Sequence, residues 1–315
     1  MNSNYLYANK LMSHSNSNKA VLFALGGNLA IAIIKFIAAF FTTSTSMLAE
    51  AIHSIADCFN QIFLLIGGKR ASRPRDEMHP FGHGREEYFW GFMVAVLLFF
   101  GGALFSVYEG IHKVLNPEPI HFLGWSLVIL GAAIFIEGSS FRVAYIEFKK
   151  SSQGSLYKGI VKSVDTSLIV ILLEDTAALM GLMFAFIFMI LASTVNPIFD
   201  GFGSICIGII LGVVSFILAR ELRNLIIGEG MPRENLNQIK AIIARDKNIK
   251  HINRLASMAM GKKYIVIVSL DFIEELNSSE VEDSIEQIKL NILKVNQNIE
   301  EIFIEARDAN RNNLV

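Results

Sequence analysis

Charged residues and cysteines are both scarce in this chain of 315 residues. Asp, Glu, Lys and Arg make up 18% of the sequence, whereas an ordinary soluble domain contains about a quarter. The two cysteines, Cys58 and Cys206, lie in apolar runs and have neither the spacing of a zinc site nor that of a disulfide framework. We therefore expect both to be small buried hydrophobic residues, and we predict no disulfide scaffold.

Several functional motifs are also missing. No basic stripe or recognition motif indicates a nucleic-acid partner. The sequence shows no nucleophile and no phosphate-binding loop, so we predict that the protein is not an enzyme and not an ATPase. The first 18 residues are polar and rich in Asn and Ser, and no apolar core precedes a cleavage site, so no cleavable signal peptide is expected.

Apolar residues, in contrast, are abundant. They make up 52% of the chain, and the mean hydropathy is +0.45. Six apolar runs approach or exceed the ~20 residues needed to cross a bilayer as a helix. The six runs are 20–42, 46–68, 87–111, 121–142, 165–192 and 198–225. The sequence therefore predicts an all-α transmembrane bundle of six helices.

Basic residues indicate how this bundle is oriented. They cluster after the second, fourth and sixth runs, and Lys113 is the exception. The clustered residues are Lys69, Arg70, Arg73, Arg75, Arg85, Lys149, Lys150, Lys158, Lys162, Arg220, Arg223 and Arg233. Because cytoplasmic loops carry an excess of Lys and Arg, we expect both termini in the cytoplasm.

A small soluble domain is predicted after the last run. We expect a polar tail over 1–18, a transmembrane domain over 19–228 and a cytoplasmic α+β domain over 229–315. The order of patterns in the last part is α-β-β-α-β, which we interpret as ferredoxin-like. Alternating apolar residues from Tyr264 to Phe272 indicate a strand, and Ser279 with Glu282 predicts a capping box before the second helix.

The stretch SMLAEAIHSIADCFNQ (46–61) is apolar but carries several ionisable side chains. Glu50, His53 and Asp57 are spaced to share one helix face. His53 and Asp57 are one turn apart, about 6 Å along the axis, which suits two ligands of one ion. The alternative is a polar seam that hydrogen-bonds neighbouring helices. Ionisable groups in hydrocarbon usually mark an ion or substrate path, so we predict a metal site.

Other runs supply further polar residues at membrane depth. Glu174 and Asp175, in ILLEDTAAL, lie deep in the fifth run and can meet His53 and Asp57. Glu174 has a second interpretation, as the partner of some buried donor. Lys35 in the first run and Glu137 in the fourth form an ion pair, or Lys35 extends its charge to the interface.

HSIAD, followed by SRPRDEMHPFGHGREE (72–87), resembles the cation diffusion facilitator family of divalent-metal/proton antiporters. EAIHSIADCFNQ and LLEDTAAL are most similar to the branch that contains the mitochondrial zinc transporter of animals. The resemblance covers nearly the whole chain. It implies a tetrahedral transport site with ligands at His53, Asp57 and Asp175. The fourth family position holds Ile171 here, and Glu174 completes the site only if the helix rotates or unwinds locally.

The resemblance implies two further sites. Asp76, His79 and His83 match an accessory metal site. The alternative interpretation is a solvated loop without metal. His251 matches one position of a histidine-rich site in the soluble domain, but Phe303 stands where another histidine is expected. We therefore predict a metal-poor domain that mainly holds two subunits of a homodimer together.

The predicted function is secondary transport, in which zinc leaves the cytoplasm and protons enter. Histidine beside carboxylate favours zinc over manganese or magnesium. The alternatives are a transporter of iron, cobalt or manganese, a carrier of an organic solute, and a non-transporting metal sensor or assembly protein. The expected partners are a divalent metal ion, protons and membrane lipid, with no organic cofactor. We expect an integral protein of a prokaryotic inner membrane.

Overall fold

The computed structural model describes residues 25–26, 28–120, 122–151 and 166–309. These residues divide into two compact units. The helical unit consists of three pieces: the chain up to Gly67, a segment that begins at Trp90, and Ser167–Arg220. The sheet unit joins Gly68–Phe89 to the chain from Glu221 onward. The predicted tail 1–18 and the basic residues Lys158 and Lys162 lie outside the described residues.

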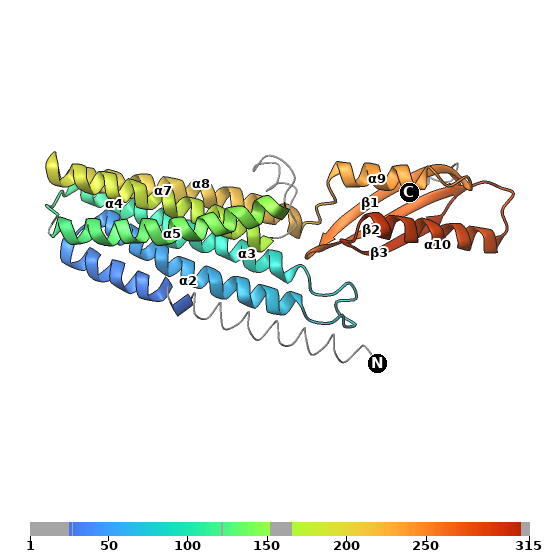
Figure 1. Cartoon of the computed structure of the whole chain (residues 1–315), viewed down its shortest axis with the longest axis horizontal. Coiled ribbons are helices and arrows are strands. Elements are labelled where there is room, and N and C mark those ends of the chain that lie inside the picture. The colour runs from blue at the N-terminus through green and yellow to red at the C-terminus, as the bar shows by residue number, and fades with distance from the viewer. Residues whose placement is uncertain (1–24, 27, 121, 152–165, 310–315) are drawn as a thin grey trace. The chain divides into compact units, whose positions relative to one another are not determined.

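The helical unit is built from long apolar helices that lie side by side (Figure 1). After a helix over Asn28–Thr42, the elements are α2 (Thr45–Ala71), α3 (Glu86–Leu97), the π-helical turn η1 (Leu98–Leu104), α4 (Phe105–Leu115), α5 (Leu123–Ser151), α7 (Thr166–Thr194) and α8 (Ile198–Ile226).

Four segments in the described parts of the chain are long and apolar enough to cross a membrane. They are Thr45–Ala71, Glu86–Leu115, Val170–Thr194 and Ile198–Ile226. The first and fourth predicted runs correspond to shorter apolar helices, Asn28–Thr42 and Leu123–Ser139. The predicted bundle of apolar helices is therefore confirmed, while a total of six spans stays a prediction.

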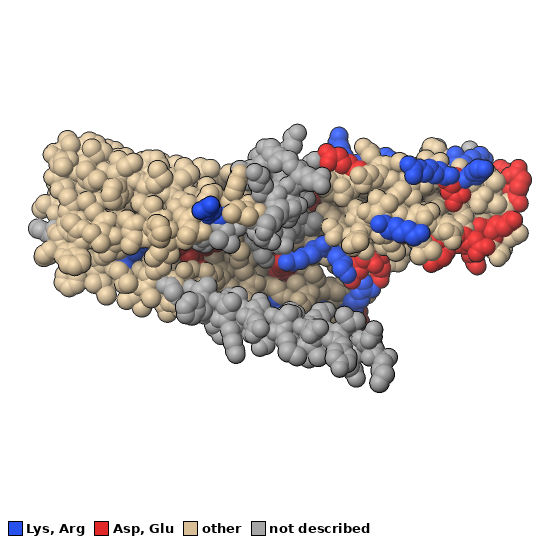
Figure 2. All heavy atoms as spheres, viewed as in Figure 1, with Lys and Arg blue, Asp and Glu red and all other residues tan. Residues whose placement is uncertain are grey.

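The helical unit buries small and aliphatic side chains and exposes large apolar ones. Its core includes Met47, Leu182 and Leu211, whereas Phe40 and Phe135 are each 80% exposed. Apolar surface of this extent indicates a lipid-facing exterior. Lys, Arg, Asp and Glu gather over the elements of the sheet unit, and few appear on the visible face of the helices (Figure 2).

The sheet unit has the predicted order α-β-β-α-β. Its elements are α9 (Arg233–Ile243), β1 (Ile249–Met260), β2 (Lys263–Phe272), α10 (Ser278–Val295) and β3 (Ile299–Ala306). β2 is central; it pairs antiparallel with β1 and parallel with β3. Alternate residues of β2, from Tyr264 to Leu270, are at most 5% exposed, so the predicted strand face is confirmed.

The predicted capping box of the second helix is wrong by two residues. The helix begins at Ser278, and its cap is Asn277, whose side chain accepts a hydrogen bond from the Glu280 backbone N–H. The Glu280 side chain in turn accepts from the Asn277 N–H. Asn caps a helix as well as Ser does, so the earlier Asn-x-x-Glu pattern outcompetes Ser279 with Glu282.

Candidate metal centre

Polar side chains of α2 line one buried face, as the sequence predicts. Glu50 and Asn60 are fully buried, His53 is 1% exposed and Asp57 is 16% exposed. The helical spacing of these positions places all four on the side of α2 that packs against other helices. A run of such groups is costly in hydrocarbon unless each finds a partner.

His53 and Asp57 come together, but they do not satisfy each other. His53 Nδ1 lies 3.6 Å from Asp57 Oδ1, which is too long for a hydrogen bond. Neither ring nitrogen of His53, nor Asp57 Oδ1, has a hydrogen-bond partner among the described residues. Buried polar atoms in proteins are almost always hydrogen-bonded. An imidazole nitrogen and a carboxylate oxygen left without partners fit a divalent cation such as zinc.

α7 contributes Glu174 to the same place. Asn60 Nδ2 donates a hydrogen bond of 2.9 Å to Glu174 Oε1, and the carboxyl groups of Asp57 and Glu174 are close enough to interact. Two carboxylates this close repel each other, so a proton or a metal cation between them is stabilising. The structure therefore places Asp57 beside both His53 of α2 and Glu174 of α7, although the ligand atoms of these three residues are not gathered as closely as those of a formed metal site.

Two neighbours on α7 differ from Glu174 in exposure. Asp175 is half-buried and makes contacts of its own. Ile171, the fourth position of the family pattern, is 37% exposed. Glu174 is 8% exposed, so the α7 face that meets Asp57 and Asn60 is the face of Glu174. No local unwinding is needed for this, because α7 is continuous from Thr166 to Thr194.

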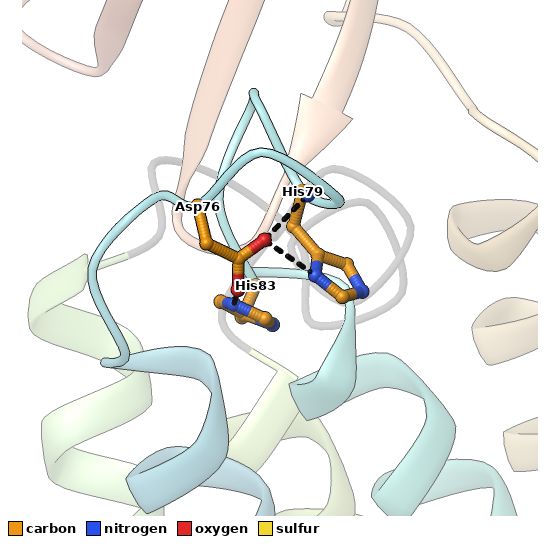
Figure 3. A group of neighbouring side chains, drawn as sticks. All are labelled: Asp76, His79 and His83. Atoms are coloured by element: carbon orange, nitrogen blue, oxygen red, sulfur yellow. Dashed lines mark hydrogen bonds and ion pairs between the residues drawn. The ribbon is translucent and has the colours of Figure 1, made fainter.

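A second group of metal-ligating residues lies in the loop between α2 and α3. Among the residues that the structure describes, three such ligands gather only at Asp76, His79 and His83, with ligand atoms within 4.8 Å of one another. Asp76 Oδ1 lies 2.9 Å from His79 Nδ1, and Asp76 Oδ2 lies 3.1 Å from His83 Nε2 (Figure 3). The hydrogen bonds from His79 hold the pKa of the Asp76 carboxyl below its usual value. The group therefore presents an ionised carboxylate and two imidazoles, which suits zinc.

The loop that carries this group is fixed within the sheet unit. Tyr88 Oη donates a 2.6 Å hydrogen bond to the Gly261 carbonyl oxygen, and Arg75 forms ion pairs with Glu300, at 3.0 Å, and with Glu301. A Cβ on Gly84 would lie 2.8 Å from the Gly261 backbone nitrogen, so the two glycines allow the backbones to touch. Asp76, His79 and His83 thus sit on an anchored loop.

His251 belongs to neither group. It lies on β1, paired with Asp271 of β2, and its side chain is exposed. No group of three metal ligands in the described chain includes it. The metal-poor soluble domain stays a prediction.

Two contacts of the buried polar face of α2, those of Asn60 and Glu50, could not be predicted from the sequence. Asn60 was visible only as a polar residue at the end of the α2 stretch, and its bond to Glu174 joins residues 114 positions apart. Glu50 was placed on the shared face, but its contact with Lys35 at 3.4 Å was not predicted. The predicted pair of Lys35 with Glu137 is confirmed, at 3.1 Å.

Several known proteins are similar to this chain in sequence. Residues 21–227 match the protein family described as "Cation efflux transmembrane domain". The mouse mitochondrial protein named proton-coupled zinc antiporter SLC30A9 is 32% identical over 285 residues, which is 86% of this chain and 50% of that protein. Metal tolerance protein C4 of Arabidopsis thaliana is 28% identical over 79% of this chain and 56% of its own length. The manganese efflux system protein MneP of Bacillus subtilis is 24% identical over 92% of this chain and 95% of its own.

Long apolar helices that enclose imidazole and carboxylate groups are typical of an integral membrane protein. The chain belongs to the cation efflux family, because the match to the family's transmembrane domain covers most of the helical unit. The chain spans about half the length of its mouse and Arabidopsis relatives.

Proposed function

We propose that the protein exports zinc from the cytoplasm in exchange for protons. The observation that carries this proposal is that Asp57 lies beside His53 of α2 and beside Glu174 of α7, with both His53 nitrogens unpartnered in the described structure. Imidazole beside carboxylate suits zinc better than magnesium or manganese, which prefer all-oxygen sites. The names of the mouse and human relatives, both called proton-coupled zinc antiporters, support the choice.

In this proposal the ligands are His53 and Asp57 from α2, with Glu174 and Asp175 from α7. His53 must be neutral to bind metal, so metal binding displaces protons. The hydrogen bond from Asn60 orients Glu174 toward Asp57, as outer partners commonly orient metal ligands. Rocking of the helices about this fixed site would expose it to each side of the membrane in turn.

The finer architecture belongs to the same proposal. It comprises six spans, cytoplasmic termini, a transmembrane domain over 19–228 and a ferredoxin-like domain over 229–315 that supports a homodimer. The location is proposed only as an energised membrane, either a prokaryotic inner membrane or a mitochondrial one, since the mouse relative is named as mitochondrial.

Manganese export is the second candidate. The Bacillus subtilis relative that aligns over 92% of this chain is named for manganese efflux. Glu174 and Asp175 would add oxygen ligands, which manganese prefers. Iron and cobalt fall in the same class. A metal sensor without transport would use the same ligands but would not move the ion.

Asp76, His79 and His83 are proposed as an accessory zinc site that modulates transport. Their ligand atoms are already gathered, and the loop is accessible to water, since Asp76 and His79 are exposed. Replacing all three residues by alanine is expected to change the rate or metal dependence of transport without abolishing it. Complete loss of transport in a well-folded triple variant would show that this site is essential instead.

Calorimetric titration of the purified full chain tests the metal centre. Zinc and manganese are titrated at fixed pH into the Asp76→Ala/His79→Ala/His83→Ala background, so that the loop does not contribute. We expect Asp57→Asn to weaken zinc binding by at least about tenfold, which corresponds to ~1.4 kcal/mol. The matched control is Glu282→Gln, at an exposed position of α10. Equal affinity in Asp57→Asn and the control would exclude Asp57 as a ligand, and tighter binding of manganese than zinc would favour the second candidate.

A further inference from the structure

Lys35 lies at the centre of a buried group of charges that metal binding does not use. It is fully buried in the helix Asn28–Thr42. Its ammonium donates to Ser54 Oγ at 2.8 Å, to Glu137 Oε1 at 3.1 Å and to Glu50 Oε2 at 3.4 Å. These three bonds use all the donors of the ammonium group. We call Lys35, Glu50, Ser54 and Glu137 the Lys35 cluster; it joins the first helix to α2 and α5.

The cluster carries more negative than positive charge. One ammonium faces two carboxylates, so its formal charge is −1 when all three groups are ionised. Glu50 Oε1 and Glu137 Oε2 are buried and have no hydrogen-bond partner in the described part of the chain. A surplus charge away from water is strongly unfavourable unless it is neutralised. One additional cation would remove that surplus.

The surroundings restrict which cation can enter. A Cβ on Gly181 of α7 would lie 2.5 Å from Glu50 Oε1, so the oxygen lies directly against that helix. The Lys35 ammonium contacts Glu50 Oε2 and Glu137 Oε1, the oxygens that are not left unpartnered. The Lys35 ammonium already occupies the position between Glu50 and Glu137 where a metal ion would bind both, which leaves a proton as the cation that fits.

Among the residues that the structure describes, few charged groups outside the cluster act on it. From α2 these are His53 and Asp57, whose charges act on Glu50 and Lys35 respectively. The charged groups that α5 and the first helix present here, Glu137 and Lys35, are members of the cluster itself. At this level α7 contributes Gly181, and its carboxylates at Glu174 and Asp175 lie about two turns away along the helix.

We propose that the Lys35 cluster is a proton-binding site separate from the metal ligands, and that it carries a counter-transported proton through Glu137 and Glu50. This rests on the proposed zinc/proton exchange. A proton from the acidic side binds a carboxylate oxygen, converts it to a neutral carboxyl group and leaves from the same oxygen on the other side. Glu50 is one turn from His53 on α2, about 4.5 Å along the axis. A metal ion near His53 therefore disfavours the proton on the cluster, and the proton disfavours the metal, which couples the two ions.

The alternative is an ion pair that only holds three helices together. Glu137→Gln separates the two possibilities, because the amide oxygen still accepts a bond from Lys35 but no longer takes up a proton. Glu137→Asp is the matched variant, since it keeps the carboxyl group. A purely structural role predicts that Glu137→Gln behaves like the wild type in its response to pH.

The experiment uses the full chain in proteoliposomes and measures two zinc fluxes. The first is uptake driven by an acidic lumen, and the second is exchange of zinc for zinc at equal pH, which needs no net proton movement. For Glu137→Gln we expect loss of the acceleration by the pH gradient, with zinc exchange retained. Glu137→Asp should keep both fluxes.

Each outcome is decisive. Wild-type acceleration by the pH gradient in Glu137→Gln overturns the proton site but leaves the proposed function intact. Absence of both fluxes in the wild type overturns the proposed function, and this proposal with it. If Glu137→Gln loses both fluxes or does not fold, Glu50→Gln is measured in the same way, and retained acceleration in that variant counts against the site.

Discussion

Glu174 is the residue on which the chemistry of the metal centre depends most. It is 8% exposed, accepts a hydrogen bond from Asn60 and lies close enough to the Asp57 carboxyl group to interact with it. Ile171, three residues before it, is 37% exposed. Since positions three residues apart lie close together on a helix surface but not at the same angle, a ligand at Ile171 would point partly away from α2.

We therefore predict opposite behaviour for substitutions at these two positions. Glu174→Gln removes a charged oxygen at constant volume and should weaken zinc binding by about tenfold or more, ~1.4 kcal/mol. Ile171→His should neither tighten zinc binding nor rescue Glu174→Gln. Isothermal titration of the single and double variants at fixed pH measures both effects. Unchanged affinity in Glu174→Gln would leave Glu174 as a buried hydrogen-bond partner of Asn60.

Asp76 gives a prediction about pH. Its pKa is lowered, chiefly by the hydrogen bond from His79, so the folded state favours the ionised carboxylate. Its contribution to folding is therefore fully present above the ordinary Asp value of ~3.9 and is lost as the pH falls through the lower folded value. In His79→Ala the midpoint of the Asp76 titration, followed by carboxyl NMR of the detergent-solubilised chain, should rise. An identical midpoint would contradict this cause.

At this scale the sequence predicts residue types and spacing better than partners. His53 and Asp57 are recognisable because a helix places them on one face. The choice between Glu174 and Asp175 depends on the rotation of α7 against α2, which no local pattern encodes. The contact between Glu50 and Lys35 likewise depends on how the first helix packs on α2.

Among the elements, α4 and α8 approach each other backbone to backbone at Gly110 and Gly201. A Cβ on Gly201 would lie 2.7 Å from the Gly110 carbonyl oxygen, and a Cβ on Gly110 would lie 2.7 Å from the Gly201 carbonyl oxygen. Ser204 Oγ donates a 2.8 Å hydrogen bond to the Ser106 carbonyl oxygen in the same interface. Small residues and interhelical hydrogen bonds of this kind hold membrane helices together where no hydrophobic effect acts between them.

Gly201→Ala is therefore expected to destabilise the helical unit. The added methyl group meets backbone atoms that cannot rotate away, and such overpacking typically costs about 1–3 kcal/mol. Gly212→Ala is the matched control on the same helix, because its Cβ would meet Ala103 Cβ at an ordinary 3.7 Å. Thermal unfolding in detergent should show a lower midpoint for Gly201→Ala alone. Equal midpoints for the two variants would contradict the packing.

The elements themselves follow closely from sequence periodicity, because apolar runs and strand alternation are local signals. Their ends are less predictable. The cap of α10 falls on Asn277 since two overlapping patterns compete there. The π-helical turn at Leu98–Leu104 interrupts an apolar run that gives no sign of it, because the extra residue is accommodated by packing rather than by composition.

For the whole molecule, we predict a homodimer to which the sheet unit contributes. On the side of β2 opposite Val266 and Val268, Ile267 is 48% exposed, and Phe303 of β3 lies beside it at 46%. Removal of the chain from residue 229 onward should weaken dimerisation, measured as molar mass by light scattering in detergent. Ile267→Lys should act in the same direction, whereas Val295→Lys at the end of α10 should not. A monomeric wild type at micromolar concentration would disprove the prediction.

The measurement that tests the central claim most directly is zinc uptake into proteoliposomes that report luminal pH at the same time. With an acidic lumen, the wild type should accumulate zinc while the lumen becomes more alkaline, and collapse of the pH gradient should stop both changes. Asp57→Asn should resemble liposomes without protein. Zinc accumulation that proceeds without any change in luminal pH, or a wild type that moves no zinc, would contradict zinc/proton exchange.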